Sequence, residues 1–161
     1  MTFMVAYDDS PLARGALRKA VEFAGPTDVE VVAVAVVPRN DVSYLRAKGW
    51  LPPAEAGEYA RHEAMAEGTV ERRIAGRVER IAPAARFEPV FTNRRLDTAR
   101  GRAVGPELRR AAVDHDATDV FVGAREAGPL VEALVDARDP RFHLHLIRRP
   151  YVPGLHVTGY S

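Results

Sequence analysis

The sequence predicts an α/β protein in which five mostly parallel strands form one sheet between two layers of helices. Three observations predict this doubly wound, three-layer sandwich. Short apolar segments alternate with helical patterns along the chain, which is typical of parallel sheets. Residues 29–37 are almost continuously apolar, as expected of a strand covered on both faces. The chain has 161 residues, 47% of them hydrophobic, which is enough for one domain with a core.

The first predicted unit is a strand followed at once by a helix. Residues 3–7 are apolar, and Ser10 can cap the helix that follows them. Pro11 suits the first helical position, because its missing N–H costs nothing there. Apolar residues then recur at helical spacing until Gly25, and the strand at 29–37 completes a strand–helix–strand unit.

A long loop is predicted next, at residues 38–57, with one helical turn near 42–48. Trp50 lies in this loop. Two interpretations of Trp50 remain open: it packs the loop against the body of the protein, or it contacts a partner.

The middle of the chain predicts a long helix and an edge strand. The helix covers residues 58–81, and two glycines inside it, Gly68 and Gly76, indicate close packing against a neighbour. Residues 86–92 form a weaker strand, and Pro89 places it at an edge because proline cannot donate to the ladder.

The last part predicts two further helix–strand pairs. Pro106 starts a helix that leads to a strand at 119–123. A short helix at 130–135 leads to the last strand, residues 142–147. We therefore expect one domain over residues 1–148 and a C-terminal arm over 149–161.

Composition excludes several classes of function. The 23 Lys and Arg residues are balanced by 22 Asp and Glu residues, so the dominant basic field of a nucleic-acid or membrane-surface protein is missing. The absence of cysteine excludes disulfides and thiolate chemistry. The longest apolar run, 31–37, is far shorter than the ~20 residues that span a bilayer, and no targeting segment is visible. We expect a cytoplasmic protein.

Ligands of doubly wound sheets bind beyond the carboxyl ends of the strands, which makes the residues there candidates for a site. Asp8 follows the first strand, where it either contacts a polar ligand or closes the turn beside Ser10. Asp9 is interpreted as a charge that favours the helix start.

Two other groups of residues are candidates for binding or catalysis. The pair His143 and His145 shares one strand face, where it either chelates a metal or lies on an exposed or dimer-contacting surface. The arginines of the loop at 93–105 either bind an anion or nucleic acid, or form a solvated surface, which the interrupting Asp97 favours. Catalytic motifs such as G-x-S-x-G, the Walker loop and H-E-x-x-H are missing, so we expect no enzyme activity.

The short sequence motifs at the ends of the predicted strands follow a recognisable order. Residues 5–10 read Val-Ala-Tyr-Asp-Asp-Ser, residues 35–38 read Ala-Val-Val-Pro, and residues 117–125 read Ala-Thr-Asp-Val-Phe-Val-Gly-Ala-Arg. Together, over about residues 3–148, they resemble the universal stress protein family. The resemblance implies an adenine nucleotide alpha hydrolase-like sandwich of five strands. It also implies a homodimer linked to stress tolerance, in a family where some members bind ATP and others do not.

Nucleotide-binding members of that family carry G-x2-G-x9-G-[ST] after the fourth strand, where glycines let backbone N–H groups approach phosphates. The corresponding positions here hold Gly123, Glu126, Asp136 and Ala137. Two glycines have thus become carboxylates, and two anions about 4 Å apart repel by ~1 kcal/mol in water and ~4 kcal/mol at an effective dielectric of about 20. The resemblance therefore implies that ATP binding is lost or very weak.

Three positions that the resemblance assigns to the adenine side persist, namely Asp8, Val36 and Gly123. They predict a vestigial adenine pocket. The leading prediction is a regulatory or binding protein of the stress response, without a cofactor and without enzyme activity. The alternative is a sensor of AMP or ATP, or a weak hydrolase, that uses a modified pocket.

The resemblance also implies a partner. Dimers of the family pair through the last strand, which here runs from Phe142 to Ile147. That strand would otherwise be an exposed apolar edge, which dimerisation removes. We expect a homodimer whose C-terminal arm reaches across the partner, an additional protein partner of unknown identity, and no membrane or nucleic-acid partner.

Overall fold

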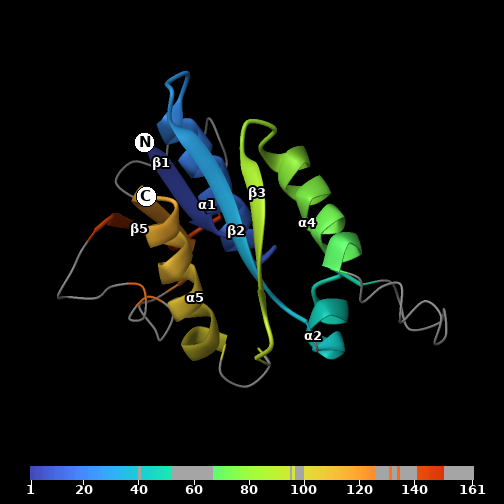
Figure 1. Cartoon of the computed structure of the whole chain (residues 1–161). Coiled ribbons are helices and arrows are strands. Elements are labelled where there is room, and N and C mark those ends of the chain that lie inside the picture. The colour runs from blue at the N-terminus through green and yellow to red at the C-terminus, as the bar shows by residue number, and fades with distance from the viewer. Residues whose placement is uncertain are drawn as a thin grey trace.

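A computed structural model describes residues 1–39, 41–51, 67–94, 96, 100–125, 131, 134 and 141–150. Its centre is a parallel five-stranded sheet with the order β3-β2-β1-β4-β5, which confirms the predicted fold class (Figure 1). The strands follow the predicted segments closely: β1 is Thr2–Ala6, β2 is Glu30–Pro38, β3 is Arg86–Thr92, β4 is Ala117–Gly123 and β5 is His143–Ile147.

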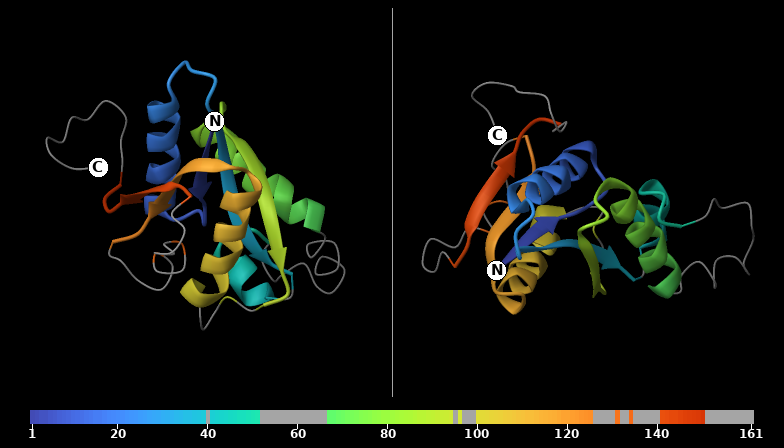
Figure 2. Two further views of the ribbon diagram at one scale, coloured as in Figure 1. Left: turned by 60° about the vertical axis from the view of Figure 1, so that its left-hand side comes forward. Right: turned by 90° about the horizontal axis from the view of Figure 1, so that it is seen from above.

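Helices cover both faces of this sheet (Figure 2). Helices α1 (Pro11–Ala24) and α4 (Glu67–Ile81) pack on one face and contact each other, while α5 (Arg100–Asp114) packs on the other face. This placement follows from right-handed crossovers, because the chain moves outward from β1 to β3 and then returns past β1 to β4. The short helix α2, Val42–Ala47, is the helical turn predicted in the long loop.

The start and end of α1 are set by the residues that the sequence indicates. The Ser10 side chain accepts a hydrogen bond from the Ala13 N–H at 3.1 Å, and Pro11 occupies the first turn. Gly25 ends the helix with a φ of 56°, a conformation that is costly for residues with a side chain. Its N–H donates to the Val21 carbonyl at 3.0 Å.

Two predictions about helices are wrong. Helix α5 begins at Arg100 and contains Pro106 in its interior, so this proline does not start the helix. The preceding residue is Gly105, which has no Cβ to clash with the proline ring, and this absence helps the helix to continue through Pro106. Close packing at Gly68 and Gly76 is also not found: a Cβ at Gly76 would meet nothing within 4 Å, and one at Gly68 would meet only the Arg72 guanidinium at 3.5 Å.

Other predictions lie partly outside the described residues. Helix α4 confirms the predicted long helix from residue 67 onward, and 58–66 lie outside the description. Of the predicted helix at 130–135, only Val131 and Leu134 are described; both are helical and buried. The predicted arm is described only for residues 149 and 150. In the part of the chain that is described, no helix has the length and apolar character needed to cross a membrane.

Candidate functional site

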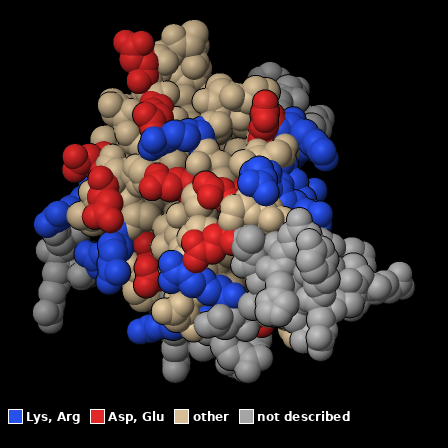
Figure 3. All heavy atoms as spheres, turned by 45° about the vertical axis from the view of Figure 1, so that its right-hand side comes forward, with Lys and Arg blue, Asp and Glu red and all other residues tan. Residues whose placement is uncertain are grey.

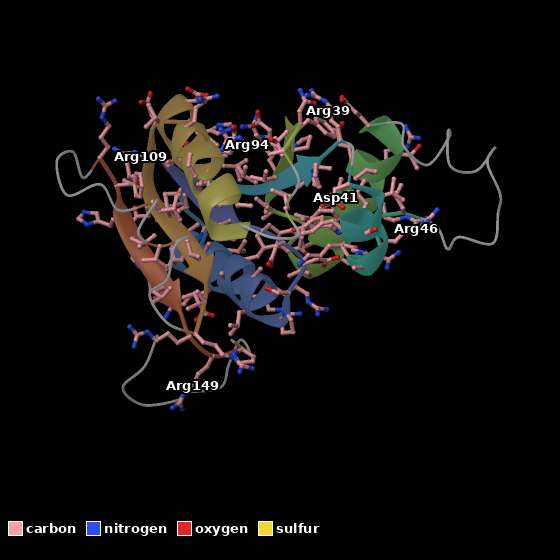
Figure 4. All side chains as sticks on the ribbon, turned by 90° about the horizontal axis from the view of Figure 1, so that it is seen from below. Arg39, Asp41, Arg46, Arg94, Arg109 and Arg149 are labelled. Atoms are coloured by element: carbon pink, nitrogen blue, oxygen red, sulfur yellow. The ribbon has the colours of Figure 1, made fainter. Side chains whose placement is uncertain are left out.

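The carboxyl edge of the sheet is uneven because β2 is longer than β1. The pairing of β1 with β2 ends at Ala6 opposite Val34, whereas β2 continues to Pro38. Beyond the end of β1, the chain supplies Asp8 and Asp9, and the segment 41–51 follows β2 at the same edge (Figure 4). This arrangement brings the acidic end of β1 next to residues from the loop after α2 and from α4.

Asp9 is the centre of a network of hydrogen bonds, which we call the Asp9 network (Tyr7, Asp9, Trp50 and Arg77). Tyr7 donates its hydroxyl to Asp9 Oδ1 at 2.7 Å, and Trp50 donates its indole N–H to Oδ2 at 3.3 Å. Arg77, from α4, forms an ion pair with the same Oδ2. The Asp9 side chain is only 10% exposed, so a carboxylate is buried together with three donors.

Arg77 extends this network to the segment that carries Trp50. Its guanidinium donates to the carbonyls of Lys48 at 3.0 Å and Gly49 at 2.8 Å. Gly49 has a φ of 71°, a conformation that glycine adopts without steric cost. One arginine thus connects α4, the end of β1 and the loop after α2.

Asp9 has a role in addition to the one that the sequence indicates. Its φ of 66° is uncommon for a residue other than glycine, although aspartate tolerates it better than most. Asp9 stands directly before the Ser10 cap of α1, at the helix start, and its carboxylate is also a largely buried acceptor that connects distant segments. The sequence showed no sign of this role, because Trp50 and Arg77 are 41 and 68 residues away along the chain.

The network also changes the ionisation of its members. Burial raises the pKa of the Asp9 carboxyl, but the hydrogen bonds from Tyr7 and Arg77, the charge of Arg77 and the Trp50 indole outweigh burial and leave this pKa below its ordinary value. Burial, reinforced by the hydrogen bond to Asp9 and its negative charge, raises the pKa of the Tyr7 hydroxyl far above its ordinary value.

The depressed pKa of Asp9 predicts that the difference in stability between the wild type and Asp9→Asn depends on pH. A group with a lowered pKa in the folded state contributes stability above its unfolded pKa of about 3.9, and this contribution disappears as pH falls through the folded value. Asp9→Asn is therefore expected to lower the free energy of unfolding at pH 7 by about 1–3 kcal/mol. The difference from the wild type should shrink below about pH 4.

Urea denaturation of both proteins between pH 3 and pH 8 measures this difference. Asparagine tolerates the same positive φ, so the substitution leaves the backbone requirement unchanged. Asp8→Asn is the matched control, since Asp8 is more exposed than Asp9. A penalty for Asp9→Asn that is equal at pH 3 and pH 7 would contradict the role of the charge.

The three predicted adenine-side residues lie on three neighbouring strands or their ends at this edge, but their surroundings differ. The Asp8 carboxylate closes the turn by accepting the Ser10 N–H at 3.0 Å, and Lys48 Nζ lies 3.6 Å from its other oxygen. The Asp8 side chain is 41% exposed, so it is accessible. Val36 is buried and belongs to the opposite face from Ala35 and Val37, because side chains alternate along a strand.

Gly123 has a packing role that its sequence context did not reveal. A Cβ at this position would lie 2.3 Å from the Leu12 carbonyl carbon and 2.7 Å from the Ala13 nitrogen. The first turn of α1 therefore packs directly on the backbone of β4. Contact of Asp8, Val36 or Gly123 with a ligand stays a prediction.

Trp50 and Asp41 hold the segment 41–51 in place. Trp50 is fully buried and packs edge-on against Tyr44, with ring centroids 6.0 Å apart, which confirms that it packs the loop against the body of the protein. Asp41 is also buried; its two carboxylate oxygens accept the N–H groups of Tyr44 and Leu96, both at 3.2 Å. The Asp41 side chain thus joins the loop after β2 to the loop after β3.

The histidine pair of β5 is divided between two environments. His145 Nε2 lies 2.7 Å from Asp119 Oδ1, and its ring stacks on Phe121, whereas His143 is exposed. Over the described ranges, no group of three or more His, Asp or Glu side chains could hold a metal ion.

Among the arginines of the loop at 93–105, only Arg94 has a described side chain, so binding of an anion or nucleic acid by this loop stays a prediction. Arg39 pairs with Glu67 at 2.5 Å and contacts the Phe91 ring, and the Arg94 N–H donates to Thr92. Side chains of Arg95, Arg100 and Arg102 lie outside the description. Positive and negative residues alternate over the face shown in Figure 3.

Comparisons with known proteins agree with this architecture. A family model described as Universal stress protein family matches residues 1–136. A solved structure of a protein of that family from Burkholderia pseudomallei is 23% identical, with a TM-score of 0.55, and the match covers 92% of this chain and 96% of that one. A comparison with curated proteins gave no match.

Two further solved structures contain nucleotides. A universal stress protein from Archaeoglobus fulgidus in complex with dAMP is 14% identical, with a TM-score of 0.52 and coverage of 91% of this chain and 95% of that chain. A universal stress protein in complex with cAMP is 15% identical, with a TM-score of 0.50 and the same coverage of both chains. At these identities, the similarity establishes the fold alone.

Proposed function

The chain belongs to the universal stress protein family, and from this premise we propose that it is a regulatory binding protein of the stress response that does not use ATP. The observation that carries the proposal is that the acidic residues after β1 already have partners within the protein. Asp9 is bonded by Tyr7, Trp50 and Arg77, and Lys48 lies beside Asp8. The protein's own segment 41–51 therefore makes contacts that a ligand would need.

The sequence adds a second argument against a triphosphate. Glu126 and Asp136 stand where nucleotide-binding members carry glycines, and Ala137 replaces the small hydroxyl residue. Phosphate binding by a glycine-rich loop depends on backbone N–H groups that approach the anion closely. Carboxylate side chains at those positions add both bulk and repulsion.

Isothermal titration with ATP and Mg²⁺ tests the proposal. We expect no measurable binding by the wild-type chain at 1 mM ATP. This corresponds to a binding free energy weaker than about −4 kcal/mol. The triple variant Glu126→Gly, Asp136→Gly, Ala137→Ser is expected to gain affinity by at least tenfold, because it removes two repulsions of about 1 kcal/mol or more each. Micromolar affinity of the wild type would end the proposal. An unchanged triple variant would show that the acids are not what prevents binding.

A nucleoside monophosphate sensor is the second candidate, and one observation favours it. The Asp8 side chain remains 41% exposed at the carboxyl edge of the sheet, and Lys48 Nζ lies 3.6 Å from its carboxylate. Two solved structures of similar fold contain dAMP and cAMP. Titration with AMP under the same conditions separates this candidate from the first, and Asp8→Asn should weaken AMP binding if the carboxylate contacts the ribose or base.

We also propose that the protein acts as a homodimer formed through β5, located in the cytoplasm. Support comes from the place of β5 at the margin of the sheet, where no other strand of the described structure pairs with its outer side (Figure 2). An unpaired, uncharged edge favours association with another strand. Light scattering is expected to give twice the chain mass of 17.7 kDa, and a monomer at every concentration would refute the dimer.

A further inference from the structure

The segment 41–51 is built as a self-contained unit. Among the residues that the structure describes, the hydrogen bonds between its backbone and other backbone groups all stay inside the segment. The donors are the N–H groups of Leu45, Lys48, Gly49, Trp50 and Leu51, and every acceptor lies within 41–46. The segment can therefore separate from the described body of the protein without breaking a strand ladder or another helix.

Side chains make the hydrogen bonds that attach this segment to the described part of the protein. At its start, Asp41 accepts the Leu96 N–H at 3.2 Å, which fixes it beside the loop after β3. Near its other end, Trp50 donates to Asp9 at 3.3 Å. The start of the segment is thus fixed near the ends of β2 and β3, and its far end lies against the end of β1.

Arg77 of α4 holds the far end in this position. Its guanidinium donates to the carbonyls of Lys48 at 3.0 Å and Gly49 at 2.8 Å, and it is ion-paired with Asp9. A planar guanidinium, with five donors, is suited to bond several acceptors at once. Arg73, one turn earlier in α4, contacts the same Gly49 carbonyl at 3.5 Å from an exposed position. Arg77 therefore connects the segment to the end of β1, and Arg73 offers a comparison.

The position of the segment restricts access to the acidic end of β1. The Asp9 side chain is only 10% exposed, and Lys48 Nζ lies 3.6 Å from the Asp8 carboxylate. Both carboxylates thus face cations that belong to the protein itself. A ligand that contacts both carboxylates has to displace the segment first.

We propose that segment 41–51 opens and closes over the end of β1, that Arg77 is the positioning residue that keeps it closed, and that a nucleoside monophosphate binds only after it opens. This inference rests on the proposed binding function of this edge and supplies its regulation. The structure described here is the closed form. A ligand that binds only the open form has its apparent affinity reduced by the fraction of molecules that are open. Arg77 thus sets the affinity without contacting the ligand.

Proteolysis of the native protein measures the opening, because the chain has only two lysines, Lys19 and Lys48. Lys48 belongs to the segment, whereas Lys19 is buried within α1. Endoproteinase Lys-C therefore cuts after Lys48 when the segment opens, and it cuts after Lys19 only when the fold itself opens. Mass spectrometry of the fragments distinguishes the two cuts.

Arg77→Met is expected to raise the rate of cleavage after Lys48 by about tenfold or more, because the segment loses two hydrogen bonds and the link to Asp9. Arg73→Met is the matched control from the same helix. It removes one long, exposed contact, so the rate should change by no more than about twofold.

Gly49→Ala opens the segment from its other side and retains both Arg77 and Asp9, in case the loss of Arg77 prevents folding. The added Cβ would lie 3.0 Å from Arg77 Nη2, and the φ of 71° at this position is unfavourable for a side chain. We expect cleavage after Lys48 to rise by about tenfold here as well.

Titration with AMP connects the opening to binding. In each variant, the affinity for AMP should rise by the same factor as the rate of cleavage after Lys48, because both depend on the fraction of open molecules. Gly49→Ala is the stricter of the two tests, since it leaves every charge at the site unchanged.

The outcomes separate the opening of the segment from the proposed function. Micromolar binding of ATP ends the proposed function and is measured on the wild type alone. Equal cleavage after Lys48 in Arg77→Met, Gly49→Ala and Arg73→Met would overturn the opening. Cleavage after Lys19 as fast as after Lys48 would also overturn it, because Arg77 would then support the whole fold. Faster cleavage after Lys48 without a gain in AMP affinity would show that the segment does not control binding, which overturns the inference too.

Discussion

Gly123→Ala is expected to destabilise the fold by about 3 kcal/mol or more, because overpacking is costly when the obstructing atoms are backbone atoms. The added Cβ would lie within 2.7 Å of three backbone atoms in Leu12 and Ala13. These atoms belong to the first turn of α1, which Ser10 caps, so relief requires a shift of the whole helix against β4. Urea denaturation without any ligand measures the loss.

Gly76→Ala is the matched control for this substitution. Gly76 lies inside α4, and its added Cβ would meet nothing within 4 Å. Alanine is favoured over glycine in a helix, so this variant should gain about 0.5–1 kcal/mol. A loss below about 1 kcal/mol for Gly123→Ala would mean that α1 adjusts readily and that the contact does not fix the helix.

Trp50→Ala is expected to lower the free energy of unfolding by about 3–5 kcal/mol, the usual range for removing a large buried aromatic side chain. Trp50 is fully buried, and its indole N–H is one of the donors to Asp9. The substitution therefore leaves a cavity and also leaves the buried carboxylate with one donor fewer. Thermal and urea denaturation measure the effect. They are followed by circular dichroism rather than by tryptophan fluorescence, because the substitution removes the only tryptophan of the chain.

Trp50→Phe separates the two contributions. Phenylalanine keeps an aromatic ring against Tyr44 but cannot donate to Asp9, so the expected loss is smaller, about 1–3 kcal/mol for the missing hydrogen bond and the smaller ring. Equal losses for the two variants would indicate that the hydrogen bond, rather than the packing, dominates. A loss below about 1 kcal/mol for Trp50→Ala would show that the segment 41–51 contributes little to the fold.

Most of the fold could be predicted because its signals are local. Ser10, Pro11 and Gly25 set the bounds of α1 through contacts within a few residues, and the continuous apolar run of β2 reveals a strand covered on both faces. Pro89 correctly indicated an edge strand, since its missing N–H is tolerated there. Pro106 misled because the helix begins earlier, at Arg100, and runs through a proline that costs it one backbone hydrogen bond; the neighbour Gly105, which has no Cβ, relieves one of the clashes.

The candidate site was harder to predict because its contacts are not local. Asp8 and Gly123 were identified by their place at strand ends, yet the packing of Gly123 against Leu12 requires knowledge of how α1 lies on β4. Asp9 looked like an ordinary charge near a helix start. Its donors come from positions 50 and 77, and no pattern in the sequence joins them to it.

The separations of 41 and 68 residues within the Asp9 network also make Trp50 a reporter of folding kinetics. Contacts between distant parts of a chain form only after the loop-closure entropy has been overcome, so they follow local helix formation. The only indole of the chain becomes buried where the end of β1, the loop after α2 and α4 meet. Stopped-flow fluorescence of the unmodified protein therefore follows the docking of these three segments, whereas far-ultraviolet circular dichroism follows the earlier formation of its helices.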